Sequence, residues 1–263
     1  MTEKVIGKGQ VQSLTRAFSL LECVADAGIG LNLSQVAAKL DLAPSTVHRL
    51  LNAMKDRGYV EVDPATGLWS VGLQAFRVGN GYLQKRDFVT QARPYMKKLV
   101  AEVGETTSLA VLDGDQMTFI AQVECREVMR MSVPLGNRVT LYASAVGKMQ
   151  LATLSDAEAA DLMKDVAFTP LTERTHVGLP SLLAEVQDIR RKGFAIDEQE
   201  QSLGMRCVAA AIYNEHREAV AFLTIAGPTV RLKQKTLNTI GKIVRALADE
   251  VTGAIGGREK DET

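Results

Sequence analysis

The sequence predicts an α+β protein in two parts, a small helical part followed by a larger part built on an antiparallel sheet. Two observations carry this prediction. Residues 33–71 have the pattern of a helix, a three-residue turn, a second helix and a β-ribbon. From residue 87 onward, segments with the two-residue alternation of strands come between segments with helical spacing. The chain has 263 residues, which suits two ordinary domains.

Apolar residues recur at helical intervals in two segments before residue 41. The first segment predicts a helix over 12–26 that ends near Gly28, and the second predicts a helix that Ser34 caps at its N-terminus. The expected apolar face of the first helix is Leu14, Ala17, Phe18, Leu21, Val24 and Ala25, and that of the second is Leu33, Val36, Ala37 and Leu40.

A further helix is predicted over 44–57, after a turn at 41–43. Pro44 suits the first turn of a helix, where its missing N–H is not needed, and Gly58 is a typical residue after a helix end. Residues 59–71 then form a hairpin about the turn 63–67. The exposed face of the helix carries Ser45, Thr46, His48, Arg49, Asn52 and Lys55.

This order of elements is typical of a winged helix-turn-helix that binds double-stranded DNA. We expect the helix 44–57 to enter the major groove, with Arg49 and His48 as the readers of bases or phosphates, because arginine can bridge O6 and N7 of guanine. The wing near Thr66 is expected to reach the minor groove or the phosphates. The alternative is a ligand-binding module that acts through protein partners, and the polar face of the helix argues against it.

The bulk composition suits a globular protein that is not a general polyanion binder. Hydrophobic residues make up 46% and charged residues 24% of a chain with zero net charge. Residues 1–86 hold ten Lys/Arg and seven Asp/Glu, a net +3, so attraction to phosphate must be local. No apolar run reaches the length of a membrane span, and the N-terminus lacks the apolar core of a signal peptide. We therefore expect a cytoplasmic protein without a membrane partner.

The domain boundaries follow from the same patterns. We expect a DNA-binding domain over 1–71, a linker helix over 72–86, a second domain over 87–255 and a disordered tail over 256–263. Within the second domain, Asp113-Gly114-Asp115 predicts a hairpin turn. The predicted helices are 88–103, 144–154, 156–164, 180–192 and 232–255, and the predicted strands are 107–112, 117–124, 128–133, 194–197, 206–213 and 219–226.

A small-residue segment, 142–148, opens one of these helices with Ser144 as its N-cap. The free N–H groups of Ala145 and Val146 would suit a carboxylate, although an ordinary capped helix has the same pattern. Alternation places Cys207 on one face of its strand and puts Thr224 and Ala226 together on one face of theirs.

The acidic segment 196–200 has the composition of solvated surface. The three histidines are scattered, and none has metal-ligand spacing to Asp or Cys, so neither a metal nor a cofactor is expected. The three cysteines are too few and too widely spaced for a disulfide framework, and Cys23 is expected in the core. An enzyme would need Cys207 as its nucleophile, and no histidine in the neighbouring motifs could act as its base.

Several segments together resemble the IclR family of bacterial transcriptional regulators over about residues 11–255. The segments are 11–17 (VQSLTRA), 45–51 (STVHRLL), 57–60 (RGYV), 104–106 (GET), 141–144 (LYAS), 147–148 (GK), 206–209 (RCVA) and 227–228 (GP). Within the family, segments 80–82, 86–87, 123–125, 129–131 and 134–136 are similar to the allantoin- and glyoxylate-responsive repressors.

The resemblance implies a winged helix-turn-helix, a linker helix and a GAF-like effector-binding domain. It also implies dimers, often paired into tetramers, on a palindromic operator. The effector would be a small organic acid whose carboxylate meets the amides of Ala145 and Val146. The sheet positions that match the family's effector-binding residues are Asp197, Met205, Cys207, Thr224 and Ala226.

The resulting hypothesis is a ligand-responsive regulator, a repressor of a catabolic operon that senses glyoxylate or a related 2-oxo or hydroxy acid. Ala226 stands where the similar repressors carry serine, which favours a larger or more apolar effector, such as an aromatic acid or a semialdehyde, as the alternative. The same residues would also suit an activator of the same fold and, more remotely, an enzyme that depends on Cys207.

Overall fold

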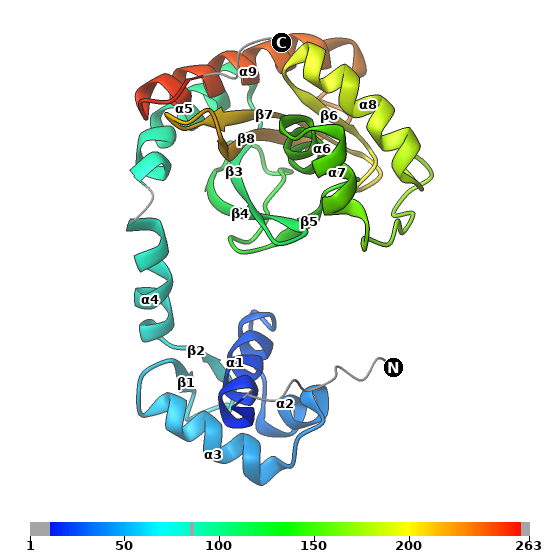
Figure 1. The fold of residues 1–263 in the computed structure, drawn as a ribbon. Helices are drawn as coiled ribbons and strands as arrows, with labels where there is room; N and C mark the ends of the chain where they lie inside the picture. Colours follow the sequence, from blue (N-terminus) through cyan, green and yellow to red (C-terminus); the bar gives the residue numbers. More distant parts are fainter. Residues whose placement is uncertain (1–10, 85–86, 259–263) are drawn as a thin grey trace. The chain divides into compact units, whose positions relative to one another are not determined.

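The computed structural model describes residues 11–84 and 87–258 (Figure 1). The chain divides into two compact units, one that ends at Arg86 and one that begins at Asp87. The expected tail at 256–263 falls mostly outside the described residues, and among those residues no helix is long and apolar enough to cross a membrane.

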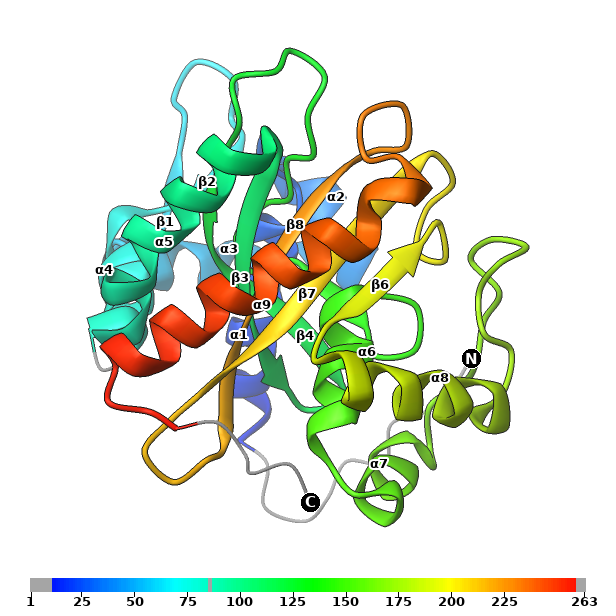
Figure 2. The same ribbon diagram turned by 90° about the horizontal axis from the view of Figure 1, so that it is seen from above.

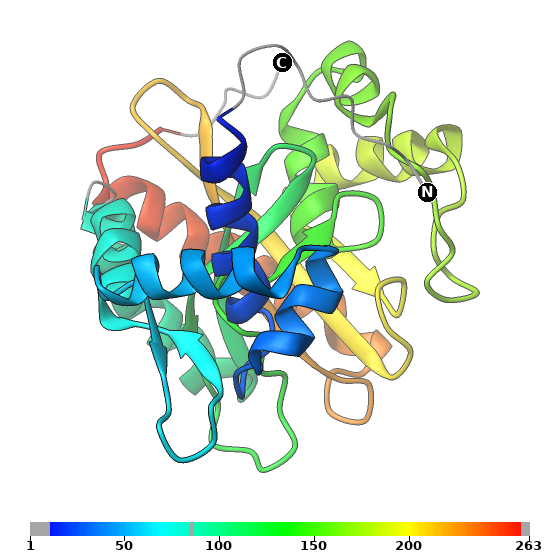
Figure 3. The same ribbon diagram turned by 90° about the horizontal axis from the view of Figure 1, so that it is seen from below.

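The first unit is a bundle of three helices with a two-stranded ribbon and a fourth helix after it, coloured blue to cyan in Figure 3. Its core contains Leu20 and Val24 of the first helix, Val47 and Leu51 of the third, and Trp69 of the ribbon. The elements are α1 (Gln12–Ala25), α2 (Leu33–Leu40), α3 (Pro44–Lys55), β1 (Val60–Val62), β2 (Trp69–Val71) and α4 (Leu73–Gln84).

Two details of this unit differ from the sequence predictions. Helix α2 is capped by Asn32 instead of Ser34, because the Asn32 and Gln35 side chains each accept a hydrogen bond of 2.9 Å from the other residue's backbone N–H. On α1, Leu14 and Phe18 are 54% and 57% exposed, because the helix buries the neighbouring stripe that contains Leu20 and Val24. Cys23 lies half-buried against the core.

The second unit is built on a six-stranded sheet in the order β5-β4-β3-β8-β7-β6, in which every neighbouring pair is antiparallel. The hairpin at Gly114-Asp115 forms as the sequence predicts, with Asp113 paired to Gln116. The strands are β3 (Thr106–Asp113), β4 (Gln116–Val123), β5 (Arg138–Thr140), β6 (Ala195–Glu198), β7 (Met205–Tyr213) and β8 (Ala219–Pro228).

Helices cover both faces of this sheet. Helices α5 (Asp87–Val103) and α9 (Leu237–Ala254) lie side by side across one face (Figure 2). Helix α6 (Ala145–Thr153) covers the other face and packs against α8 (Leu179–Lys192), which in turn contacts α7 (Asp156–Met163). The apolar cluster between α6 and the sheet contains three of the sequence-predicted effector residues, Ala145, Val146 and Cys207.

Two predictions in this unit were wrong. Residues 128–133 form no strand, because β4 pairs with Arg138–Thr140 instead, and Val128 is 97% exposed. The edge strand beside β4 is β5, farther along the chain. The closing helix begins at Leu237 instead of residue 232, after a 3-10 turn at Gln234–Thr236.

Candidate functional site

Helix α3 presents a polar face because its apolar face is fixed in the core. Val47 and Leu51 are fully buried, which turns the opposite side of the helix outward. The structure places all six sequence-predicted DNA-binding residues on this helix: Ser45, His48, Arg49 and Lys55 are exposed, and Thr46 and Asn52 are half-buried.

Two of these side chains interact with each other. The Asn52 amide donates a hydrogen bond to the His48 carbonyl at 2.8 Å, and its nitrogen lies 3.1 Å from Nε2 of His48. Asn52 therefore holds the His48 ring in place, whereas Arg49 has no such partner within the described residues and extends freely. At the C-terminal end of the helix, Lys55, Arg57 and Arg77 line a cleft that sequence reasoning did not find.

The ribbon that follows α3 has a tight, exposed turn. The Ala65 N–H donates to Asp63 Oδ1 at 2.8 Å, and this bond lowers the pKa of the Asp63 carboxyl. Gly67 adopts a φ of 69°, which a residue with a side chain rarely takes. The wing thus has a defined tip next to Thr66.

The second candidate site is a row of side chains that crosses three strands. Asp197 on β6 pairs directly with Cys207 on β7, and Cys207 pairs with Ala226 on β8. Directly paired residues point to the same face, so the three side chains are neighbours. Thr224 and Met205 lie two residues from members of this row and share the face.

The N-terminal end of α6 belongs to the same cluster. Ser144 caps the helix: its Oγ accepts from the Gly147 N–H at 3.1 Å and donates to the Thr140 carbonyl at 2.6 Å. The N–H groups of Ala145 and Val146 stand in the first turn, where a helix offers no acceptor for them. Both residues are buried in the cluster that includes Cys207.

Gly147 is required by a close approach of two backbones. A Cβ at this position would lie 2.4 Å from Cα of Leu141 and 2.5 Å from its carbonyl oxygen. The contact lets the start of α6 pass directly over the preceding segment, and it explains a glycine inside a helix.

The electrostatics of the row depend on Asp197, which is 1% exposed. Burial raises the pKa of Asp197 to about 7, although its Oδ1 accepts from the N–H groups of Glu200 at 2.7 Å and Gln201 at 3.3 Å. Burial and the Asp197 carboxyl together raise the pKa of the Cys207 thiol well above its ordinary value. The thiol therefore stays protonated, which is the opposite of what a cysteine nucleophile requires.

The hydroxyl of Thr224 also has a partner. Its Oγ1 donates to the Val208 carbonyl at 2.9 Å, so its proton is engaged and only its lone pairs face the row. Beside it, Ala226 contributes only a methyl group. The sheet face at this row therefore offers Asp197 as an ionisable group. The neighbouring side chains, Cys207, Ala226 and Met205, are less polar.

Comparison with known proteins identifies both units. The pattern of the bacterial transcriptional regulator IclR C-terminal domain matches residues 80–252, and that of the IclR helix-turn-helix domain matches residues 13–64. The chain belongs to the IclR family of bacterial transcriptional regulators. Members of the IclR family are DNA-binding transcriptional regulators and not enzymes. The alternative of a Cys207-dependent enzyme therefore does not apply.

Curated relatives and solved structures agree with this assignment. The chain is 40% identical to the acetate operon repressor of Salmonella typhimurium, over 95% of this chain and 92% of that protein. It is 34% identical to the HTH-type transcriptional repressor AllR of Escherichia coli, over 97% of this chain and 93% of that protein. The crystal structure of a transcriptional regulator from Rhodococcus superposes with a TM-score of 0.83 at 28% identity, over 94% of this chain and 99% of that chain.

One group in the IclR effector domain was missed by sequence reasoning. Lys148 is fully buried, with Nζ 2.7 Å from Glu185 Oε1 and 2.5 Å from Glu200 Oε1. The prediction that the acidic segment 196–200 is solvated surface was wrong, since Asp197 and Glu200 are buried. The reason is the buried lysine, which in a single sequence looks like an ordinary surface residue.

Proposed function

We propose that this IclR-family protein is a ligand-responsive repressor of a catabolic operon. It binds a palindromic double-stranded operator through α3 and senses a small organic acid in the effector domain. The observation that carries the proposal is the row Asp197, Cys207 and Ala226, which lies on the sheet face covered by α6. The names of the relatives, an acetate operon repressor and AllR, support a repressor.

The DNA contacts follow from the exposed face of α3. Arg49 is the side chain best suited to guanine, because its planar fork donates to O6 and N7 together. Ser45, Thr46 and Lys55 supply phosphate contacts near the two ends of the helix, and Asn52 positions His48. Two such domains in a dimer would engage half-sites on one face of the duplex.

The effector pocket has complementary ends. The N–H groups of Ala145 and Val146, at the positive end of the α6 dipole, suit a carboxylate. At the other end, Asp197 with its pKa near 7 can donate to an oxo group or accept from a hydroxyl. This pairing suits glyoxylate or a related 2-oxo or hydroxy acid.

A second candidate effector is a larger, more apolar acid, such as an aromatic acid or a semialdehyde. Ala226 provides no hydroxyl, the Thr224 proton is bound to Val208, and Met205 offers an apolar wall. A ligand with further oxygens beside Ala226 and Thr224, out of reach of Asp197, would leave those oxygens without donors, which costs about 1–3 kcal/mol for each buried group.

The response to the effector requires two arrangements of the dimer with different affinities for the ligand. We propose that residues 72–86 carry the change between the domains and that a dimer, or a pair of dimers, is the DNA-binding form.

The DNA assignment is tested by gel shift of the variant Arg49→Ala with the promoter next to the gene that encodes this protein. The loss of one bidentate contact is expected to weaken specific binding by about 5- to 150-fold, from about 1–3 kcal/mol per contact. Arg49→Lys keeps the charge but loses the fork, and it is expected to bind with relaxed specificity. Lys39→Ala, an exposed cation on α2, is the control. Undiminished sequence-specific binding by Arg49→Ala would refute the assignment.

The effector assignment is tested by a thermal-shift screen of 2-oxo, hydroxy and aromatic acids, because a ligand that binds the folded state raises the melting temperature. Calorimetric titration of the best acid into Cys207→Ala then probes the row. An affinity equal to that of the wild type would remove Cys207 from the pocket.

A further inference from the structure

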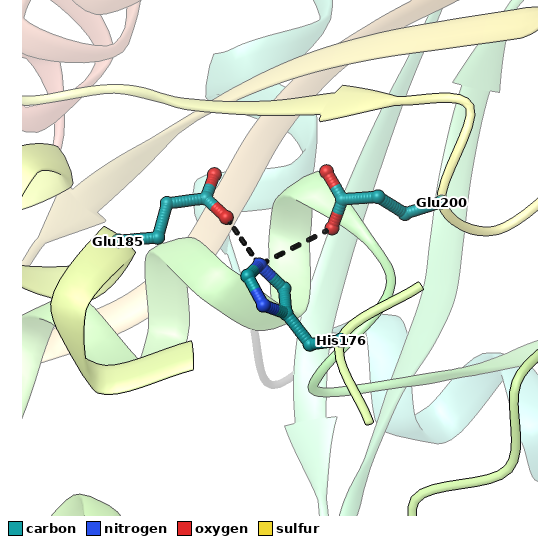
Figure 4. A group of neighbouring side chains, drawn as sticks. All are labelled: His176, Glu185 and Glu200. Atoms are coloured by element: carbon teal, nitrogen blue, oxygen red, sulfur yellow. Dashed lines mark hydrogen bonds and ion pairs between the residues drawn. The ribbon is translucent and has the colours of Figure 1, made fainter. Parts of the chain in front are cut away.

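A second cluster of side chains, made of ionisable groups, lies beside the effector row (Figure 4). It consists of His176 on the loop before α8, Glu185 on α8 and Glu200 on the turn after β6, with Lys148 of α6 against the two carboxylates. One nitrogen or oxygen from each of His176, Glu185 and Glu200 lies within 4.8 Å of the others. His176 and Glu185 are nine positions apart and Glu200 lies farther along the chain, so no short metal-ligand spacing marks the three residues.

The two carboxylates use their oxygens in the same way. Oε1 of Glu185 and Oε1 of Glu200 accept from Lys148 Nζ, at 2.7 Å and 2.5 Å. Oε2 of each carboxylate turns toward the other side, where Nε2 of His176 lies 2.6 Å from Glu185 Oε2 and 3.9 Å from Glu200 Oε2. Lys148 and the imidazole therefore stand on opposite sides of the carboxylate pair.

Glu200 provides an independent sign of a ligand. The residue is 5% exposed, and its Oε2 is fully buried with no hydrogen-bond partner among the described residues. The 3.9 Å to Nε2 of His176 is too long for a hydrogen bond. Buried carboxylate oxygens in native proteins accept a hydrogen bond or bind a cation. Oε2 points toward the atoms with which it could share a cation (Figure 4).

The imidazole of His176 is oriented with Nε2 toward the two carboxylates, where it could bind such a cation. Its Nδ1 lies 3.1 Å from Ser181 Oγ, and Ser181 Oγ in turn donates to the Gly178 carbonyl at 2.9 Å. A metal-binding histidine commonly donates its second ring N–H to such an outer partner, which fixes the ring and its tautomer. Lys148 has the equivalent role for the carboxylates, because it binds the oxygens that face away from the histidine.

The two distances from His176 Nε2 to the carboxylate oxygens, 2.6 Å and 3.9 Å, bracket the spacing of a zinc site. Zinc bonds to nitrogen and oxygen are about 2.0–2.2 Å, so ligand atoms in a tetrahedral site lie about 3.4 Å apart. Nε2 of His176 would need to move away from Glu185 Oε2 by about 0.8 Å and toward Glu200 Oε2 by about 0.5 Å to reach that spacing. Side-chain rotations of this size require no backbone change. With neutral histidine the cluster carries one net negative charge, which a cation would offset.

We propose that His176, Glu185 and Glu200 bind one divalent transition-metal ion of the zinc class, with a water molecule as the fourth ligand. The ion joins the loop before α8, α8 itself and the turn after β6. Because the Glu200 N–H donates to Asp197 Oδ1, the ion also fixes the turn that holds the effector row. The proposal is independent of DNA binding and of the identity of the effector.

The test uses the full chain after treatment with a chelator, and Zn²⁺ alone is the probe. Equilibrium dialysis with metal analysis is expected to give one tightly bound ion per wild-type chain and a large loss of affinity in His176→Gln. The matched control is His216→Gln, which removes an exposed histidine that also lies near a carboxylate, 3.6 Å from Glu215. The control is expected to bind as the wild type does.

Two further readouts make the result independent of one variant. Zn²⁺ is expected to raise the melting temperature of the wild type and not that of Glu185→Gln, which keeps a similar shape. The sequence has three histidines, so His48→Gln and His216→Gln assign the imidazole NMR signal of His176 by elimination. That signal is expected to shift with Zn²⁺. Three results would each overturn the proposal: no stoichiometric ion in the wild type, an unmoved His176 signal, or undiminished binding by a folded His176→Gln. The cluster would then be a network of hydrogen bonds and ion pairs alone.

Discussion

Replacing Asp197 with asparagine is expected to remove a pH-dependent loss of stability from the effector domain. Burial raises the pKa of Asp197 from 3.8 to about 7, so between these values the folded state holds a proton that the unfolded state has released. Stability from this group is fully present below pH 3.8 and is lost as the pH rises through 7. Asparagine keeps an oxygen for the Glu200 and Gln201 N–H groups but does not titrate.

The size of the effect follows from the two pKa values. Each unit of separation corresponds to about 1.4 kcal/mol. Between pH 5.5 and pH 8, linkage gives a loss of about 2 kcal/mol in the free energy of unfolding from Asp197 alone. Burial also raises the pKa of Glu200, which acts in the same direction, so the difference between wild type and Asp197→Asn isolates the contribution of Asp197.

The assay is urea denaturation at the two pH values, followed by circular dichroism. Trp69 is the single tryptophan of the sequence and is buried in the first unit, so its fluorescence reports separately on the DNA-binding domain. Between the two pH values, the free energy of unfolding of the effector domain is expected to fall by about 2 kcal/mol more in the wild type than in the variant. Equal pH dependence in the two proteins would show that Asp197 does not titrate near pH 7 and would refute the reasoning.

Three other substitutions have expected outcomes that thermal or urea denaturation can check. Lys148→Met leaves two carboxylates beside each other without their cation and is expected to cost about 3–5 kcal/mol, a cost that an added Glu200→Gln should partly recover. Gly147→Ala places a Cβ against the Leu141 backbone and is expected to cost about 1–3 kcal/mol, and near-neutral stability would contradict the close approach. Asn32→Ala removes the cap of α2 and is expected to cost about 1 kcal/mol in the DNA-binding domain, measured by fluorescence.

The predictions that succeeded depend on local periodicity or on register. The polar face of α3 follows from the spacing of Val47 and Leu51, which fixes the buried side of the helix. The shared face of Thr224 and Ala226 follows from the two-residue repeat of a strand. Such patterns repeat within one element, so a single sequence contains them.

The predictions that failed depend on contacts between distant segments. Residues 128–133 alternate like a strand, but a strand needs a partner, and β4 pairs with β5 at Arg138–Thr140 instead. Leu14 and Phe18 have the spacing of a core stripe, but the rest of the unit packs on the stripe of Leu20 and Val24. Which of two apolar patterns is buried is decided by the partner element.

The buried charges show the same limit in the effector domain. Glu200 was expected at the surface because acidic runs are usually solvated. Its burial depends on Lys148, which lies 52 positions earlier. Neither residue alone suggests a buried pair, because an unpaired charge is almost never found in a core. Only the packing of α6 against β6 brings the two residues together.

These charged contacts also explain how the two ends of the proposed effector pocket keep a fixed separation. Lys148 lies three residues after Ala145 on α6, and its Nζ binds Glu200, whose N–H binds Asp197 Oδ1. The chain of bonds therefore links the helix start that would receive a carboxylate to the acid on β6. A pocket whose ends are fixed in advance loses less entropy when it binds a small ligand. Breaking the chain at Lys148 should weaken effector binding even in conditions where the domain remains folded, because the two ends would then move independently.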